Sequence, residues 1–359
     1  MKNRIIGFDL ARAYAILGMY IVNFNTVFGN HTNQSGLSGF LNLFNGNSST
    51  LFVMLAGMGV SLMSSRSHYT VEEKRIIKST IIKRSWFLFI LGVIFCFWWP
   101  ADILHFYGGY MHIAVLFIFL PKRYYLFAAA GSIVIFHFLL AFIPYETGWD
   151  FKTLMYTDFW TIEGFIRNTF YNGWNSIFPW IAYFLIGMYL GRLNWKNTST
   201  PKKVILVGLA FYLMTFFLQS FATSFTQDKE LLSYLTADYL PPFLPFMIGT
   251  ISFGLILISA FIFIGNKVSE FRIAKILAST GQMTLTHYIS HLMLGLFLFS
   301  SFTGKTLGFE MINESPTNPL FILVFSVFYF LFSCIFTLLW LKKFKLGPLE
   351  LLMRKVFNS

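Results

Sequence analysis

The chain has 359 residues, of which 56% are hydrophobic and only 12% are charged, and its formal net charge is +12 at pH 7. Because soluble domains average about 25% charged residues, this composition excludes a soluble domain and indicates a multi-pass membrane protein. The two cysteines, Cys96 and Cys334, both fall within apolar runs. The sequence therefore predicts no disulfide framework and no metal site built from cysteines.

Apolar runs of roughly 17–25 residues are long enough to cross a bilayer as helices. About ten such runs follow one another along the chain. We therefore expect an all-α bundle of transmembrane helices that forms a single membrane domain over residues 1–359. The predicted spans are 9–28, 48–65, 83–99, 102–120, 123–143, 175–193, 203–223, 242–264, 278–300 and 319–341.

The basic residues predict the orientation of these spans. If the amino terminus is cytoplasmic, most of the 27 lysines and arginines fall in cytoplasmic segments. The outer segments then carry only Lys152, Arg167, Lys229 and Lys305. Cytoplasmic loops show this excess of basic residues, so both termini are predicted to be cytoplasmic. The positive charge is thereby explained by orientation and contact with membrane lipids, and no nucleic-acid partner is expected.

The first predicted span carries polar residues that a bilayer disfavours. Asp9 and Arg12 lie three residues apart near its start, share a helix face and can form an ion pair. They also interrupt the pattern of a cleaved signal peptide, so this span is expected to be retained. Asn23 lies near the other end of the helix, and His31 follows in a polar loop. A charge at the bilayer centre costs about 2.5–3.5 kcal/mol, so such groups are expected to pair or to function.

Further ionisable residues lie in two later spans. Asp102 precedes His105 by three residues, where it can cap the helix or orient the imidazole, and His112 lies on the same face. His287 and His291 are four residues apart and also share a face. Three interpretations stay open: hydrogen bonds between helices, the polar cavity of a transporter or channel, and haem ligation by the histidines.

The predicted span at 175–193 ends with Gly187, Gly191 and Arg192. Two glycines four residues apart allow another helix to approach closely, and this common pattern indicates packing rather than function. Arg192 is expected to anchor the helix at the membrane surface, with contact to a phosphate group as the alternative.

Several stretches resemble known families of membrane proteins. Residues 8–12, which read FDLAR, and the later Asn23 resemble the opening helix of the transmembrane acyltransferase superfamily, which includes heparan-α-glucosaminide N-acetyltransferase. The stretches 102–108, 178–192 and 281–288, together with the tail at 344–350, are similar to the bacterial YeiB-like family.

The resemblance implies a membrane-bound acyltransferase in a bacterial cell membrane. Such an enzyme moves an acyl group, expected to be acetyl, from cytoplasmic acyl-CoA to a hydroxyl or amine on the far side. The acceptor is expected to be an envelope glycan, a lipid or a small molecule. The resemblance assigns catalytic positions to Asn23 and His31, since an amide can hold an oxyanion and an imidazole can take the acceptor proton.

The remaining candidates receive lesser roles under this interpretation. Asp9 and Arg12 support the first helix, and Arg192 is a candidate contact for a CoA phosphate. The other polar residues of the spans are expected to support the site or line a cavity. No metal is expected, and a homo-oligomer is compatible with the sequence.

Overall fold

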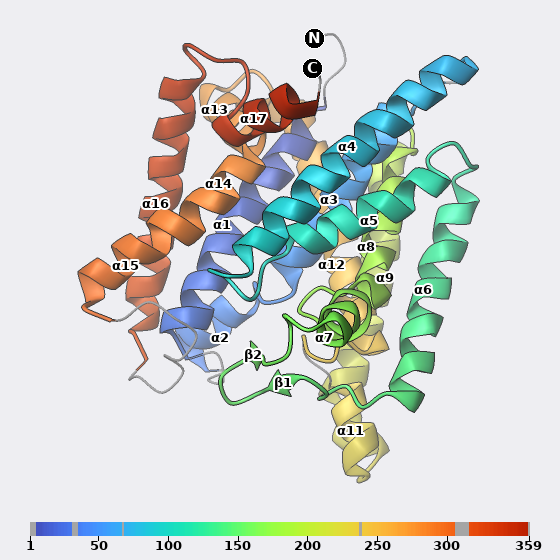
Figure 1. Ribbon diagram of the computed structural model, residues 1–359, viewed down its shortest axis with the longest axis vertical. Coiled ribbons are helices and arrows are strands. Elements are labelled where there is room, and N and C mark those ends of the chain that lie inside the picture. The colour runs from blue at the N-terminus through green and yellow to red at the C-terminus, as the bar shows by residue number, and fades with distance from the viewer. Residues whose placement is uncertain (1–4, 31–34, 67, 237–238, 306–315, 358–359) are drawn as a thin grey trace. The chain divides into compact units, whose positions relative to one another are not determined.

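The computed structural model describes residues 5–30, 35–66, 68–236, 239–305 and 316–357 (Figure 1). Nearly all regular structure in this part of the chain is helical, which confirms the predicted all-α class. The residues group into two compact units. Unit 1 comprises residues 1–52, 195–212 and 250–356, and unit 2 comprises residues 53–194, 213–249 and 357–359.

Unit 1 is built on the first helix and on helices from the C-terminal third of the chain. Four helices contribute residues to both units: α3 (Asn47–Met63), α9 (Ser199–Ser220), α12 (Leu244–Val268) and α17 (Pro348–Phe357), of which only Phe357 falls in unit 2. The other elements of unit 1 are α1 (Ile6–Phe28), α2 (Gly36–Asn42), α13 (Arg272–Gly281), α14 (Thr284–Ser290), the π-helix η2 (His291–Gly295), α15 (Leu296–Thr303) and α16 (Pro319–Trp340).

Helix α1 packs closely against the C-terminal helices of unit 1. Figure 1 shows it in blue alongside α14 and α16. Gly281 ends α13 so near to α1 that a Cβ atom at this position would lie 2.0 Å from the carbonyl oxygen of Asp9. A Cβ atom on Gly7 would likewise lie 2.4 Å from the Cα atom of Ile262 in α12. These glycines let helix backbones meet, which fixes the first turns of α1.

Unit 2 contains most of the middle of the chain. Its helices are α4 (Val71–Phe95), α5 (Leu104–Phe117), α6 (Arg123–Phe142), α7 (Ile162–Arg167), the π-helix η1 (Asn168–Asn172), α8 (Ile177–Gly191), α10 (Ala222–Phe225) and α11 (Lys229–Leu235). Strands β1 (Trp149–Asp150) and β2 (Met155–Tyr156) form an antiparallel pair. Helix α4 lies beside α5, and α6 packs against α8 (Figure 1).

The packing role predicted for the two glycines of α8 is confirmed. A Cβ atom on Gly187 would lie 2.0 Å from the carbonyl oxygen of Met54 in α3. A Cβ atom on Gly191 would lie 3.0 Å from the carbonyl oxygen of Met58. Helix α3 also has a glycine at this crossing, since a Cβ atom on Gly57 would lie 2.0 Å from the carbonyl oxygen of Phe184. Neither helix tolerates a larger side chain at this crossing.

Apolar helices in the described part of the chain indicate a membrane protein. Six stretches are long and apolar enough to cross a bilayer. These are Gly36–Met63, Arg123–Phe142, Ser199–Ser220, Leu244–Val268, Thr284–Thr303 and Pro319–Trp340. The other predicted spans correspond to α1, α4, α5 and α8, which are shorter or more polar. The count of about ten spans, the single membrane domain and the cytoplasmic termini therefore stay predictions.

Two helices differ in extent from the apolar runs that predicted them. Helix α4 begins at Val71, well before the predicted start at 83, because a capping box starts it: Glu73 N–H donates to Thr70 Oγ1 at 3.1 Å and Thr70 N–H donates to Glu73 Oε2 at 2.9 Å. The predicted span at 278–300 is interrupted, since α13 ends at Gly281 and α14 restarts the helix at Thr284.

Candidate functional site

A pair of polar side chains joins α1 to η2 within unit 1. The Nδ2 atom of Asn23 lies 2.7 Å from the Nε2 atom of His291. His291 is fully buried, and Asn23 is half-buried. The sequence singled out both residues but in separate groups, and the fold brings them into contact.

The surroundings of His291 assign the proton to one ring nitrogen. Its Nδ1 atom lies 3.3 Å from the carbonyl oxygen of His287, which can only accept a hydrogen bond. Nδ1 therefore carries the proton, and Nε2 presents a lone pair to which the Asn23 amide donates. The second N–H of Asn23 and its carbonyl oxygen make no hydrogen bond to another described residue.

Aromatic side chains surround His291 in unit 1. The Tyr20 ring lies 5.2 Å from the His291 ring and 5.0 Å from the Tyr329 ring, measured between centroids. The Tyr20 hydroxyl is 3.0 Å from Ser333 Oγ on α16. A hydrogen bond to a group buried in this way is stronger than it would be in water. Burial of His291 therefore strengthens its contact with Asn23.

The helix that carries His291 departs from regular α geometry at this residue. The π-helix η2 begins at His291 and ends at Gly295, and π-helical turns are rare and occur frequently at functional sites. Gly295 lies against α1, where a Cβ atom would be 3.0 Å from Phe24 Cζ. One turn earlier, His287 Nε2 lies 3.0 Å from Thr337 Oγ1 on α16. The histidines predicted to share a face thus have different partners.

Glu350 of α17 fixes the start of α14. Its Oε1 atom accepts hydrogen bonds from the backbone N–H groups of Leu285, at 2.8 Å, and Thr286, at 3.1 Å. Its Oε2 atom accepts a hydrogen bond from the Thr286 hydroxyl. A carboxylate is favourable at a helix N-terminus because the N–H groups there lack helical partners. Burial nevertheless raises the pKa of Glu350 above its usual value.

The predicted ion pair of the first helix is confirmed. Arg12 Nη1 lies 2.9 Å from Asp9 Oδ1, and Asp9 is 2% exposed. Gln282 Nε2 lies 3.5 Å from the other oxygen of Asp9, in the break between α13 and α14. These contacts lie where α1 meets α13, which fits the supporting role expected for both residues.

His31, the histidine predicted to be catalytic, lies outside the described residues. Its predicted role therefore stays a prediction. Asn23 belongs to the same α1 helix that leads into this part of the chain, so it is the described member of the predicted catalytic pair.

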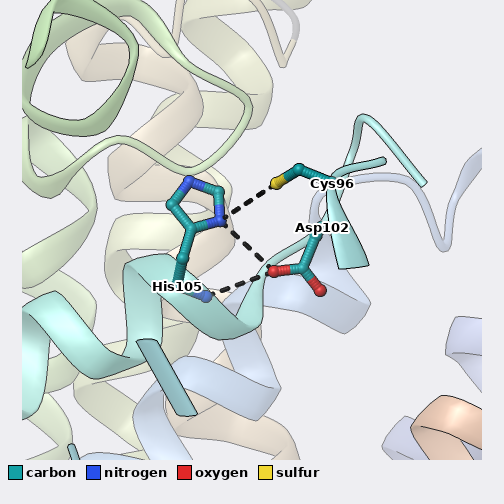
Figure 2. Close-up of side chains that lie close together, drawn as sticks. All are labelled: Cys96, Asp102 and His105. Atoms are coloured by element: carbon teal, nitrogen blue, oxygen red, sulfur yellow. Dashed lines mark hydrogen bonds and ion pairs between the residues drawn. The ribbon is translucent and has the colours of Figure 1, made fainter. Parts of the chain in front are cut away.

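A second polar cluster lies in unit 2 and joins the end of α4 to the start of α5. Figure 2 shows Cys96, Asp102 and His105 pointing toward one another. His105 Nδ1 lies 3.2 Å from Asp102 Oδ2 and 3.7 Å from Cys96 Sγ. Asp102 Oδ2 also accepts the backbone N–H groups of Leu104, at 2.8 Å, and His105, at 3.2 Å. Asp102 therefore both caps α5 and orients His105, the two roles the sequence offered.

Two other candidates of unit 2 are held by local contacts. His112 Nδ1 lies 2.9 Å from the carbonyl oxygen of Gly108 and also contacts Ser85 Oγ. Arg192 Nη2 donates to Ser64 Oγ at 2.8 Å and to the carbonyl oxygen of Ile118 at 2.7 Å. Arg192 thus ties the end of α8 to the ends of α3 and α5, which agrees with the anchoring role expected for it.

Sequence reasoning missed Glu350 and Thr337, whose contacts come from residues far apart in the chain. Glu350 is the one acidic side chain in the basic stretch 342–359. That isolated carboxylate was the available signal. Thr337 carries no comparable signal, because threonines in apolar helices commonly bond to their own backbone.

The comparisons with known proteins agree with the fold. Residues 4–204 match the family model for heparan-alpha-glucosaminide N-acetyltransferase, catalytic. Residues 190–359 match the family model described as a protein of unknown function, DUF418. Among curated proteins, no significant match is found.

The first of these matches covers more than half of the chain and includes Asn23, and it points to a membrane acetyltransferase-like protein. The resemblance inferred from the motifs is thereby confirmed. The chain belongs to the family of the heparan-alpha-glucosaminide N-acetyltransferase catalytic domain, in a form with a YeiB-like C-terminal half.

Proposed function

We propose that this protein is an integral-membrane acyltransferase that moves an acetyl group from cytoplasmic acyl-CoA to an acceptor outside the cytoplasm. The acceptor is a hydroxyl or amine of an envelope glycan, a lipid or a small molecule. The family match supports the transferase class. The observation that carries the proposal is the 2.7 Å contact between Asn23 and His291, because it joins a half-buried, oriented amide to a buried neutral imidazole.

Acyl transfer from a thioester requires a base and a donor for the oxyanion. The acceptor oxygen or nitrogen forms a bond to the carbonyl carbon, and its proton passes to the base. Negative charge develops on the carbonyl oxygen, where a preorganised N–H group stabilises it. The carbon–sulfur bond then breaks, and the base returns the proton to the departing CoA thiolate.

Asn23 is proposed as the oxyanion donor. One N–H of its amide is engaged by the lone pair of His291 Nε2, which determines the orientation of the amide. The second N–H has no partner among the described residues and is the group that would donate to the oxyanion. His291 is then a positioning residue, since it acts through Asn23.

His31 is proposed as the general base that takes the acceptor proton. A neutral imidazole has an ordinary pKa of about 6.5, which suits proton transfer near neutral pH. The ion pair of Asp9 and Arg12 lies at the opposite end of α1 and would brace the helix on the side where acyl-CoA enters. The basic residues of the proposed cytoplasmic segments support this direction, with the protein in a bacterial cell membrane.

The proposal is tested by release of CoA in proteoliposomes. The purified chain is reconstituted with acetyl-CoA, with and without glucosamine as an added acceptor, and free thiol is measured over time. We expect His31→Ala to lower the rate by about 10²–10⁴, the range for loss of a general base. His137→Ala is the matched control, because His137 lies in α6 of unit 2 and contacts Tyr234 of the same unit at 3.1 Å.

The control variant is expected to keep the wild-type rate. Thiol release by His31→Ala at the wild-type rate, with the variant still eluting as a folded protein, would contradict the assignment of the base. Wild-type release no faster than that of empty liposomes would contradict the acyltransferase itself.

A further inference from the structure

The Cys96–Asp102–His105 cluster of unit 2 has a composition that the proposed acyl transfer does not use. Its three members supply a thiol, a carboxylate and an imidazole, and all three residues are buried. One possible ligand atom from each residue lies within 4.8 Å of the other two. This set of ligand types in so small a volume is typical of a metal site.

Two of the three distances between the ligand atoms agree with a tetrahedral ion. Zinc binds sulfur at about 2.3 Å and nitrogen or oxygen at about 2.0–2.2 Å, so two ligand atoms in a tetrahedral site lie roughly 3.3–3.6 Å apart. His105 Nδ1 lies 3.7 Å from Cys96 Sγ and 3.2 Å from Asp102 Oδ2. Both separations differ from the tetrahedral values by only a few tenths of an ångström. The remaining pair, Cys96 Sγ and the Asp102 carboxylate, lies within 4.8 Å, so an ion fits if the side chains adjust to bring these two atoms to the tetrahedral separation.

A cysteine nucleophile is a poorer explanation of the same cluster. In a catalytic triad the nucleophile and the carboxylate contact different nitrogens of the imidazole. Here Cys96 and Asp102 both approach Nδ1, while Nε2 is buried without a hydrogen-bond partner among the described residues (Figure 2). His105 thus cannot accept a proton from Cys96 at one nitrogen while Asp102 holds the other.

We propose that Cys96, Asp102 and His105 bind a divalent transition metal of the zinc class, with a fourth ligand position open to a small ligand. The proposal is independent of the acyltransferase assignment. Zinc accepts a thiolate, an imidazole and a carboxylate, and three protein ligands leave one position for water or substrate. The two anionic ligands neutralise the charge of the ion, so the occupied site carries no net charge into the buried interior.

Binding of the ion requires particular protonation states of Cys96 and His105. Cys96 must lose its thiol proton, which leaves to solvent. His105 binds the ion through Nδ1 in the tautomer that carries its proton on Nε2. Each bound ion therefore releases about one proton.

The neighbourhood of the cluster keeps the ligands together and dry. Cys96 packs with Tyr156 and Phe159, and Trp149 and Phe165 cover this group. An apolar shell of this kind controls the access of solvent to a metal site. On the α4 side, Gly92 leaves room for the start of α5, because a Cβ atom there would lie 2.5 Å from Asp102 Oδ2.

The experiment measures zinc bound to the full-length, tag-free protein. The protein is purified in detergent, stripped with a chelator, loaded with ZnCl₂, desalted and analysed by elemental mass spectrometry. We expect about one zinc per wild-type chain and a loss of most of it in Cys96→Ser. Cys334→Ser is the matched control, because Cys334 is the other buried free cysteine and contacts Thr280 rather than the cluster. It should retain zinc as the wild type does.

A second variant separates metal binding from folding. Asn caps helices as well as Asp does, so Asp102→Asn should keep the cap of α5 and the thermal stability of the metal-free protein but weaken zinc binding by at least tenfold. Wild-type protein loaded with Co²⁺ should also show a thiolate charge-transfer absorption, which needs no variant. A wild type that retains no zinc and lacks this absorption, or a folded Cys96→Ser that retains as much zinc as wild type, would overturn the proposal.

Discussion

The two units each hold a buried histidine, and the difference lies in what the second ring nitrogen contacts. His291 of unit 1 donates from Nδ1 to the carbonyl oxygen of His287, and its Nε2 accepts from Asn23. His105 of unit 2 directs Nδ1 toward Asp102 and Cys96, and its Nε2 has no partner in the described part of the chain. Both nitrogens of the His291 ring therefore have hydrogen-bond partners, whereas only Nδ1 of the His105 ring has partners among the described residues.

This difference separates the chemistry available to the two histidines. An imidazole that is hydrogen-bonded at both nitrogens is fixed in one tautomer and holds its partner in place. An imidazole nitrogen that lies beside a thiol and a carboxylate can bind one ion together with them. We therefore assign the Asn23–His291 pair to positioning at the acyl-transfer site and the Cys96–Asp102–His105 cluster to metal binding.

The largest effect that distinguishes the two sites is expected from a glycine of unit 2. In Gly92→Ala, the new Cβ atom would lie 2.2 Å from the backbone nitrogen of His105 and 2.5 Å from Asp102 Oδ2. Overpacking of this kind typically costs about 1–3 kcal/mol, so we expect a lower melting temperature and loss of bound zinc. The matched control is Gly131→Ala in α6, where a Cβ atom meets nothing within 4 Å. Equal melting temperatures and equal zinc contents for the two variants would refute the packing argument.

A smaller effect is expected from removing the partner of Asn23 in unit 1. His291→Ala leaves the Asn23 amide without the lone pair that orients it, and a loss of about 1.4 kcal/mol corresponds to about a tenfold fall in kcat for acyl transfer. His291→Gln should recover part of the rate, because its side-chain oxygen can accept the same N–H. The check is the CoA-release assay at saturating acetyl-CoA. A His291→Gln variant as slow as His291→Ala would argue against an orienting hydrogen bond.

The smallest effect concerns pH and the carboxylate that fixes α14. Burial raises the pKa of Glu350, so the folded state favours the protonated form more than the unfolded state does. Protonation of Glu350 therefore stabilises the folded state. This stabilisation is fully present below the unfolded pKa of about 4.3 and is lost as the pH rises through the higher folded pKa. Glu350→Gln does not titrate. We expect the melting temperature of wild type relative to Glu350→Gln to fall as pH increases across this window.

The measurement is differential thermal unfolding of both proteins in one detergent between about pH 4 and pH 8. A constant difference across this range would show that burial does not control the ionisation of Glu350.

Local spacing in the sequence predicted much of the structure. Apolar runs located helices near every predicted span, and residues three or four apart correctly paired Asp9 with Arg12 and Asp102 with His105. The glycine pair of α8 correctly indicated close packing. These successes share one cause, since each depends on contacts within a helix or on the absence of a side chain.

The contacts that build the candidate site were beyond such reasoning. Asn23 and His291 are separated by 268 positions, and Glu350 lies 65 positions from Leu285. No periodic pattern records which helices meet in the fold. The break between α13 and α14 was also missed, because the N–H groups of the restarted helix are satisfied by the distant carboxylate of Glu350 rather than by a local cap.

The central claim is that Asn23 stabilises the oxyanion of an acyl-transfer reaction. The most direct test is the rate of acetyl transfer by the Asn23→Ala variant. Wild-type and Asn23→Ala proteins are reconstituted in the same lipid with radiolabelled acetyl-CoA, and CoA release and labelled product are measured together. We predict that the variant folds and that its kcat is lower than that of the wild type by a factor of about 10²–10³, the usual effect of removing one oxyanion donor. A folded Asn23→Ala protein with the wild-type kcat would contradict the account.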